Sequence, residues 1–179
     1  MDRKFYVASV GQPGEDYVEY NWERCVNYNC HVMHKETSQK GVFDDVKENS
    51  ICFLKYNNKL IAYGEVEGKF TKPELVLWED KNWCYVIKVK EWIFFDKTNK
   101  RKGVEKGGID KATIKGSQMA TIKEVSPDYG LQKMKEIEID SDLYRKVLLE
   151  LNTKNNMDKL LKLLEANKNL ILTGAPGTG

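Results

Sequence analysis

Trp78 and Trp83 bracket four polar or charged residues in the middle of the chain. Tryptophans in a polar loop leave apolar area exposed unless they bind something. Aromatic faces stack on nucleobases, at about 1–3 kcal/mol per base, and they favour methyl groups through polarised C–H bonds, as aromatic cages do. The pair therefore predicts a site for a flat, modified base, with ordinary packing as the alternative. Trp92 lies inside an apolar run and fits core packing better.

The end of the sequence has the pattern of a phosphate-binding loop. Apolar residues at 170–172 lead into Gly174, Gly177 and Gly179. In a complete loop, backbone N–H groups cradle phosphates, and a following Lys and Ser or Thr hold phosphate and magnesium. The sequence given has the glycines without those two residues, so we expect no NTPase activity and no cofactor for this chain. GTP or ATP with Mg is expected only in a longer parent, and a flexible Gly-Pro-Thr tail is the alternative.

A cysteine and histidine cluster is the candidate for metal chemistry. Cys25, Cys30, His31 and His34 have the spacing C-x4-C-H-x2-H. These side chains suit zinc, but the spacing fits no common zinc finger. We therefore expect a loop without a metal. A zinc-dependent hydrolase or RNA-modifying enzyme built on this cluster is the alternative from another class. No Ser/His/Asp set, carboxylate pair or nuclease signature is visible, which favours binding over catalysis.

Composition and charge favour a globular protein. The chain has 179 residues, of which 41% are hydrophobic, and its net charge is only +2. No apolar run approaches 18 residues and no signal peptide is visible, which predicts a cytoplasmic protein with reduced thiols. Basic residues concentrate after residue 96, where a surface stripe would suit a phosphate backbone, with a solvated lysine-rich loop as the alternative. The candidates are Lys97, Lys100, Arg101, Lys102, Lys106 and Lys111.

The elements that must position these residues follow from hydrophobic patterning. Strands are predicted at 5–10, 50–56, 59–66 and 83–95, with a two-residue hairpin turn at 57–58. Ser126 followed by Pro127 predicts a helix start, and Ser141 begins a second helix. A polar break is expected at 152–156, before an amphipathic helix from Met157 to about Asn167. The pattern predicts an α+β domain at 1–140 with a small curved sheet or open barrel, and a helical linker at 141–168.

Residues 4–138 resemble the YTH domains, a branch of the PUA-like superfamily that includes the EVE modules. The resemblance rests on the first strand at 5–9, Trp22, the hairpin at 51–66, and the motif Trp78-x4-Trp83 leading into Trp92-Ile93-Phe94. It implies an α+β, PUA-like (YTH/EVE-type) curved sheet or open β-barrel flanked by helices. It also implies a cage of Trp22, Trp78 and Trp83 for a methylated base, with Ser9, Asp16 and Asn21 at the base edge or phosphate.

The segment 169–179 resembles the start of the AAA+ motor of McrB-type restriction proteins. Together the two resemblances imply a domain that targets a modification-dependent restriction system by reading N6-methyladenine in DNA, flipped into the tryptophan cage. The isolated module would be monomeric. The parent would form a ring oligomer and recruit a nuclease subunit of McrC type. A reader of modified cytosine in DNA, or of methylated RNA, is the alternative with the same fold.

Overall fold

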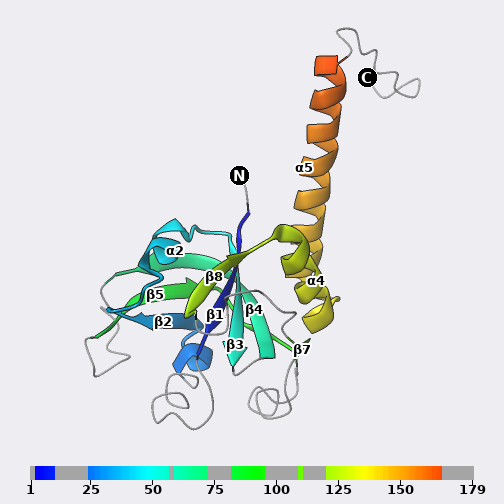
Figure 1. The fold of residues 1–179 in the computed structure, drawn as a ribbon. Helices are drawn as coiled ribbons and strands as arrows, with labels where there is room; N and C mark the ends of the chain where they lie inside the picture. Colours follow the sequence, from blue (N-terminus) through cyan, green and yellow to red (C-terminus); the bar gives the residue numbers. More distant parts are fainter. Residues whose placement is uncertain are drawn as a thin grey trace.

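The computed structural model describes residues 3–10, 24–56, 59–71, 82–95, 109–110 and 120–166, with the backbone alone at 109–110. Figure 1 shows the arrangement of the strands and helices in these ranges. The strands are β1 (Phe5–Ser9), β2 (Cys30–His34), β3 (Ile51–Tyr56), β4 (Lys59–Phe70), β5 (Trp83–Val89), β6 (Ile93–Phe94), β7 (Ile109–Asp110) and β8 (Ile122–Val125). The helices are α2 (Lys40–Asp45), α4 (Pro127–Glu138) and α5 (Asp142–Ala166). Among the described helices, none has the length and apolar character to span a membrane.

The strands form one sheet with the order β2-β5-β4-β3-β1-β8, and β6 and β7 also pair with β4. β1 runs parallel to β3, whereas the other pairs within the described residues are antiparallel. Within the described residues, strands β2 and β8 end this path, so the sheet is open. The predicted α+β class, with an open sheet flanked by helices, is confirmed.

β4 is the longest strand and organises the sheet around itself. Tyr56 pairs with Lys59, which confirms the predicted two-residue hairpin between β3 and β4. The first half of β4 pairs with β3 and β6, and its second half pairs with β5 after a register shift beyond Val66. β4 passes so close to the backbone of Glu91 that glycine is needed at position 64, because a Cβ there would meet the carbonyl oxygen of Glu91 at 2.5 Å. β4 therefore reaches both the α5 side of the domain and the strand that carries Trp83.

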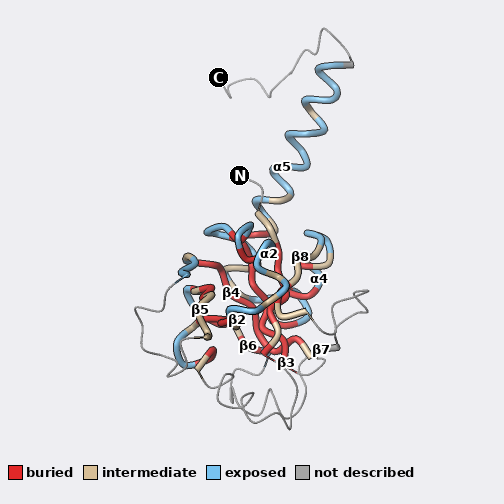
Figure 2. Tube along the Cα trace, turned by 60° about the vertical axis from the view of Figure 1, so that its left-hand side comes forward, coloured by how far each residue is buried: buried red, intermediate tan, exposed pale blue. Residues whose placement is uncertain are grey.

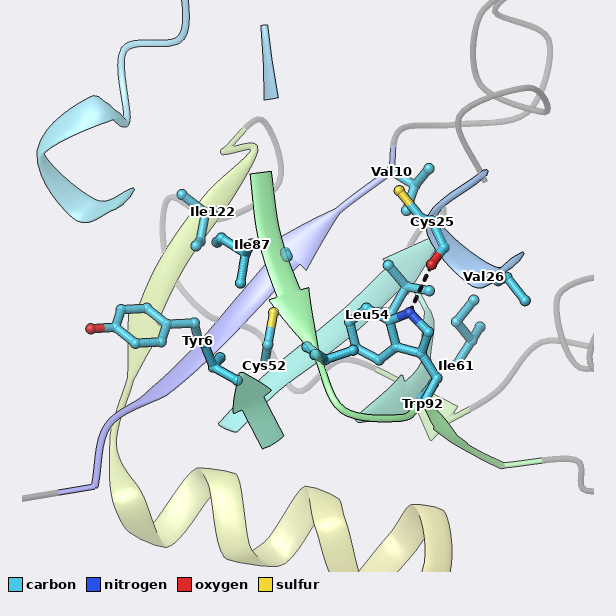
Figure 3. Packing of buried hydrophobic residues seen from close by; sticks show 14 of the residues in the cluster. Tyr6, Val10, Cys25, Val26, Cys52, Leu54, Ile61, Ile87, Trp92 and Ile122 are labelled. Carbon is cyan, nitrogen blue, oxygen red and sulfur yellow. Dashed lines mark hydrogen bonds between the residues drawn. The ribbon is translucent and has the colours of Figure 1, made fainter. Parts of the chain in front are cut away.

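The central strands are buried along most of their length (Figure 2), and their alternating residues belong to two hydrophobic clusters, one on each face. One face carries Tyr6, Cys52, Ile87 and Trp92, which belong to the larger hydrophobic cluster seen in Figure 3. The opposite face carries a second cluster, in which residues of β1, β3 and β4 pack against α4 and the first turns of α5. Because both faces are covered, β3 is buried at every position, and its sequence is an apolar run interrupted only by Lys55 rather than an alternating pattern.

The predicted start of α4 is confirmed, since Ser126 Oγ accepts a hydrogen bond from the Tyr129 N–H and Pro127 is the first helical residue. Ser141 likewise caps α5 by accepting from the Tyr144 N–H at 3.0 Å. α4 lies so close to β1 that a Cβ on Gly130 would come within 2.2 Å of the Phe5 ring. The glycine that weakens the helical pattern in the sequence is thus the residue that permits the contact.

The predicted polar break at 152–156 is wrong, because α5 is one continuous helix from Asp142 to Ala166. A helix that already has formed turns on both sides extends at little cost through exposed polar residues. Its first turns pack on the sheet through residues between Leu143 and Leu151, and its second half projects from the domain (Figures 1 and 2). The prediction of a single strand over 83–95 is also corrected, since β5 ends at Val89 and β6 begins at Ile93.

Candidate nucleic-acid interface

Trp83 begins β5, and a bulge decides which way its side chain faces. Met33 pairs with Tyr85, but His34 pairs with Trp83, so Cys84 is skipped in the ladder. Because side chains alternate along a strand, this extra residue turns Trp83 away from the large core cluster that contains its neighbours Tyr85 and Ile87. Trp83 packs instead on a small cluster of Cys30, Val32 and Val86. It is partly buried there.

His34 supports this indole from the neighbouring strand. The two ring centroids lie 5.6 Å apart with the ring planes at 77°, an edge-to-face contact. His34 Nδ1 accepts a hydrogen bond from the Glu36 N–H at 3.3 Å, so the neutral ring carries its proton on Nε2. The Lys35 N–H donates to the Asn82 carbonyl oxygen at 2.6 Å and ties the two strand ends together. Trp83 is therefore held in place beside the His34 imidazole.

Ser9 lies at the end of β1 and is linked to β2 through Thr121. The Ser9 N–H donates to the Thr121 carbonyl oxygen at 2.8 Å, and the Thr121 N–H donates to Gln39 Oε1 at 3.1 Å. His31 of β2 lies beside the same Thr121 backbone. The structure therefore connects Ser9 with β2 through Thr121.

The cysteine and histidine cluster does not form the loop that was expected. Cys30, His31 and His34 lie on β2, and Cys25 lies in a helical turn at 24–27. His31 is buried and neither ring nitrogen has a hydrogen-bond partner by geometry. Burial lowers the pKa of His31 to about 4, against a smaller opposing effect of the Thr121 backbone. The ring is therefore neutral near pH 7.

The thiols belong to the core as well. Contact with Cys30 and burial raise the pKa of Cys25 well above its ordinary value, and burial raises the pKa of Cys52 to about 12. Neither group is a thiolate near neutral pH. Within the described ranges, no group of three or more His, Cys, Asp or Glu side chains is arranged to hold a metal ion.

Several residues of the predicted site lie outside the described residues. They are the cage candidates Trp22 and Trp78, the base-edge candidates Asp16 and Asn21, the backbone candidates Lys97, Lys100, Arg101, Lys102, Lys106 and Lys111, and the phosphate-loop glycines Gly174, Gly177 and Gly179. Of the predicted set, the structure places Trp83 and Ser9. It adds His34 as a neighbour of Trp83, which only the pairing of β2 with β5 reveals.

The chain has structural neighbours among solved proteins, although no protein-family model and no curated protein matches its sequence. It is similar to the YTH domain of Mmi1 in a complex with RNA, with a TM-score of 0.46 and 13% identity over 76% of this chain and 79% of that chain. The YTH domain of Mmi1 in a separate crystal structure gives a TM-score of 0.43 and 13% identity, over 76% of this chain and 96% of that chain.

A third similar structure is protein Atu2648 from Agrobacterium tumefaciens. It gives a TM-score of 0.43 and 11% identity, over 75% of this chain and 93% of that chain.

Proposed function

We propose that residues 1–140 form a nucleic-acid-binding module that reads a methylated base, most specifically N6-methyladenine in DNA. The observation that supports this best is the placement of Trp83. A bulge turns its indole out of the main core, His34 contacts it edge to face, and the residue as a whole is only partly buried. Trp83 thus has two properties that a stacking wall needs, a fixed orientation and an apolar face, and in this proposal a base stacks on it.

Trp78 and Trp22 complete the proposed cage. Trp78 precedes Trp83 by five positions, and Trp22 precedes the helical turn at 24–27. Both assignments come from the resemblance to YTH domains and are carried to these positions by motif. Three aromatic walls would enclose the N6-methyl group, whose polarised C–H bonds face the rings. Ser9, Asp16 and Asn21 remain the proposed contacts to the base edge or phosphate.

A duplex target requires the base to leave its stack. Flipping costs a few kcal/mol, and stacking on the cage walls offsets it. The basic residues Lys97, Lys100, Arg101, Lys102, Lys106 and Lys111 are proposed to hold the phosphate backbone, which contributes affinity without base preference. In this division of roles the tryptophans decide which base is bound, and the lysines and arginine decide how tightly any strand is bound.

We further propose that the module targets a McrB-type motor for modification-dependent restriction. The motor would begin at the loop carrying Gly174, Gly177 and Gly179, would use GTP or ATP with Mg in a longer parent, and would act with a nuclease of McrC type. α5 suits the connection, because its first turns pack on the sheet and its second half projects outward. The module itself carries out no chemistry in this proposal.

Binding to matched oligonucleotides tests the proposal. Affinities are measured for strands that differ only in N6-methyladenine, adenine or 5-methylcytosine, each as DNA and as RNA. We expect the methyladenine DNA to bind tightest, and Trp83→Ala and Trp78→Ala each to remove about 1–3 kcal/mol of that binding. Phe95→Ala is the matched control, because Phe95 is an aromatic residue with 45% exposure outside the tryptophan set.

Each outcome has a distinct meaning. Preference for 5-methylcytosine or for methylated RNA would support a modified-base-binding module with a different ligand from the one proposed. The comparison of RNA with DNA tests recognition of the 2′-OH. Equal affinity for methylated and plain adenine in every arm would overturn the assignment. Loss of binding in Phe95→Ala equal to that in the tryptophan variants would show that the effect is not specific to the cage.

A further inference from the structure

The side of the sheet that carries Trp83 continues across β5 to an exposed aromatic residue on β4. Phe70, the last residue of β4, pairs with Val86 of β5. Val86 belongs to the small cluster on which Trp83 packs. Because paired residues of neighbouring strands place their side chains on the same side of a sheet, Phe70 and Trp83 share one face. This outer face consists of Gly68 and Phe70 on β4, Trp83, Val86 and Lys88 on β5, and Cys30, Val32 and His34 on β2.

Phe70 holds its ring along this face. The residue is 49% exposed. A Cβ built on Gly68 would have the Phe70 Cζ atom at 3.8 Å as its neighbour among the described residues, so the ring extends back along β4. Glycine at position 68 puts no side chain of its own beside the ring. Single exposed apolar residues are common on proteins, but this one shares its face with Trp83 and His34.

The opposite side of the same strands is packed. Ile87 belongs to the large core cluster, and the ring of Tyr85 lies 5.1 Å from the ring of Phe43 on α2, centroid to centroid. Lys69 reaches the same helix, where its ammonium group donates to the Phe43 carbonyl oxygen at 3.1 Å. Since successive residues of a strand face opposite sides, the contact of Lys69 with α2 fixes Phe70 on the outer face.

The outer face carries a cation and no carboxylate at its eight positions. Lys88 lies one pair beyond Val86 on the same side, and its ammonium group donates to the Tyr28 carbonyl oxygen, which keeps the charge beside the sheet. Glu36, whose carboxylate is 3.9 Å from His34 Nδ1, lies beyond the end of β2. Aromatic rings together with a lysine are the combination that binds single-stranded nucleic acid, through stacked bases and an attracted phosphate backbone.

We propose that the outer face binds the nucleotide next to the methylated base, with the base of that nucleotide stacked on Phe70. This inference rests on the proposed function, because it takes Trp83 as the wall on which the methylated base stacks. Phe70 and Trp83 lie diagonally on neighbouring strands, about 7–8 Å apart, so two successive unstacked bases can reach both. The partner is therefore a single strand or an unpaired stretch, since a paired neighbour stays in the duplex stack.

Phe70→Ala removes the stacking surface and tests the proposal. We expect its affinity for single-stranded DNA with one N6-methyladenine to fall by about fivefold or more, the lower end for one stacked base. The ratio of affinities for methylated and plain strands should not change, because Phe70 does not contact the methylated base. The salt dependence should also stay the same, since no phosphate contact is lost. Phe95→Ala is the matched control, because Phe95 is 45% exposed and lies outside the outer face.

Abasic strands identify the base that stacks on Phe70. Each strand lacks the base on the 5′ side or on the 3′ side of the N6-methyladenine. The wild-type protein should lose affinity for one of them, and Phe70→Ala should lose nothing further with that strand, as a double-mutant cycle measures. Phe70→Trp should retain binding, whereas Phe70→Leu, which keeps apolar bulk without a ring, should bind as weakly as Phe70→Ala. Urea denaturation checks that each variant is folded, and Phe70→Leu decides the question if Phe70→Ala does not fold.

The outcomes separate this inference from the proposed function. A wild-type protein without preference for methyladenine, in which Phe70 still couples to a neighbouring base, overturns the reader alone. A wild-type preference for methyladenine with unchanged affinity in Phe70→Ala and Phe70→Leu overturns the stacking role alone. An equal loss in Phe95→Ala, or a loss that persists on both abasic strands, also overturns that role. A changed ratio in Phe70→Ala would place Phe70 at the methylated base, and absence of binding to every strand would overturn both proposals.

Discussion

The carboxylate of Glu65 on β4 lies 2.9 Å from the ammonium group of Lys146 on α5, although 81 positions separate the two residues. Arg3 and Lys90 bind the same carboxylate at 3.1 and 2.9 Å. Two residues earlier, the Tyr63 hydroxyl bonds to the Glu138 carbonyl oxygen and contacts Ser141, where α4 ends and α5 begins. One strand thus fixes the start of the helix that projects from the domain.

Replacing Glu65 with Gln should weaken the attachment of β4 to the first turns of α5. Gln removes the buried negative charge that faces Arg3, whose side chain is 7% exposed, whereas Lys90 and Lys146 are half exposed and can turn toward water. We expect a loss of about 2–3 kcal/mol in the free energy of unfolding, below the cost of a fully buried pair. Urea denaturation measures it. Lys40→Ala breaks the exposed pair with Asp44 and should change stability by less than about 0.5 kcal/mol.

The same carboxylate predicts a pH dependence. Burial acts to raise the pKa of Glu65, but hydrogen bonds from Lys146, Lys90 and Arg3 outweigh it and lower the pKa to about 2. A lowered native pKa stabilises the fold at pH values above the unfolded pKa near 4.5. This stabilisation, about 3 kcal/mol, should be lost as pH falls from about 4.5 to about 2. Acid unfolding of Glu65→Gln should lack this component, and equal slopes for the two proteins would contradict the assignment.

The sequence predicted the elements whose signals are local. The β3–β4 hairpin follows from a two-residue turn between apolar runs, and α4 follows from Ser126 before Pro127. β2 and α2 were not predicted, because β2 is set by its pairing with β5 and α2 is only six residues long. The break expected at 152–156 was wrong because local polarity does not stop a helix with exposed sides.

The site could be predicted only in part. The spacing of Trp78 and Trp83 marks a candidate pair, but the direction of Trp83 depends on a bulge whose signal lies in the neighbouring strand. From the sequence, His34 was a candidate zinc ligand. In the fold it is the edge-to-face neighbour of Trp83. Sequence patterns within one segment therefore identified the tryptophans as candidate stacking residues, whereas strand pairing was needed to identify the neighbours of Trp83.

α4 packs so closely against β1 at Gly130 that a larger residue there should clash with β1. A methyl group there would lie 2.2 Å from the Phe5 ring, and Phe5 is fully buried, so the ring has no free space to move into. Gly130→Ala should therefore lower the free energy of unfolding by about 1–3 kcal/mol, the cost of overpacking. Higher helix propensity alone would stabilise by up to about 1 kcal/mol. A more stable variant in urea denaturation would show that α4 moves away from β1 without penalty.

Lys100 and Arg101, which lie outside the described residues, are predicted to bind phosphates. Lys100→Ala or Arg101→Ala should weaken binding to methylated and plain strands by the same factor, because a phosphate contact carries no base information. Each should also reduce the slope of log affinity against log salt concentration by about one. Titrations at several salt concentrations measure both effects. A changed preference between methylated and plain strands would place the residue at the base instead.

Trp83 and Trp92 should respond oppositely to truncation, because their surroundings differ. Trp92 is 3% exposed, packs in the large cluster and makes a buried hydrogen bond, so Trp92→Ala should cost about 3–5 kcal/mol of stability. Within the described residues, Trp83 packs on a cluster of three buried residues and contacts His34 edge to face. Trp83→Ala should therefore cost less stability, about 1–2 kcal/mol, while it removes binding to the methylated strand. Urea denaturation and oligonucleotide titration on the same samples compare the two. If Trp83→Ala destabilises as much as Trp92→Ala and the folded fraction still binds methyladenine with its original preference, Trp83 is a core residue and not a wall of the site.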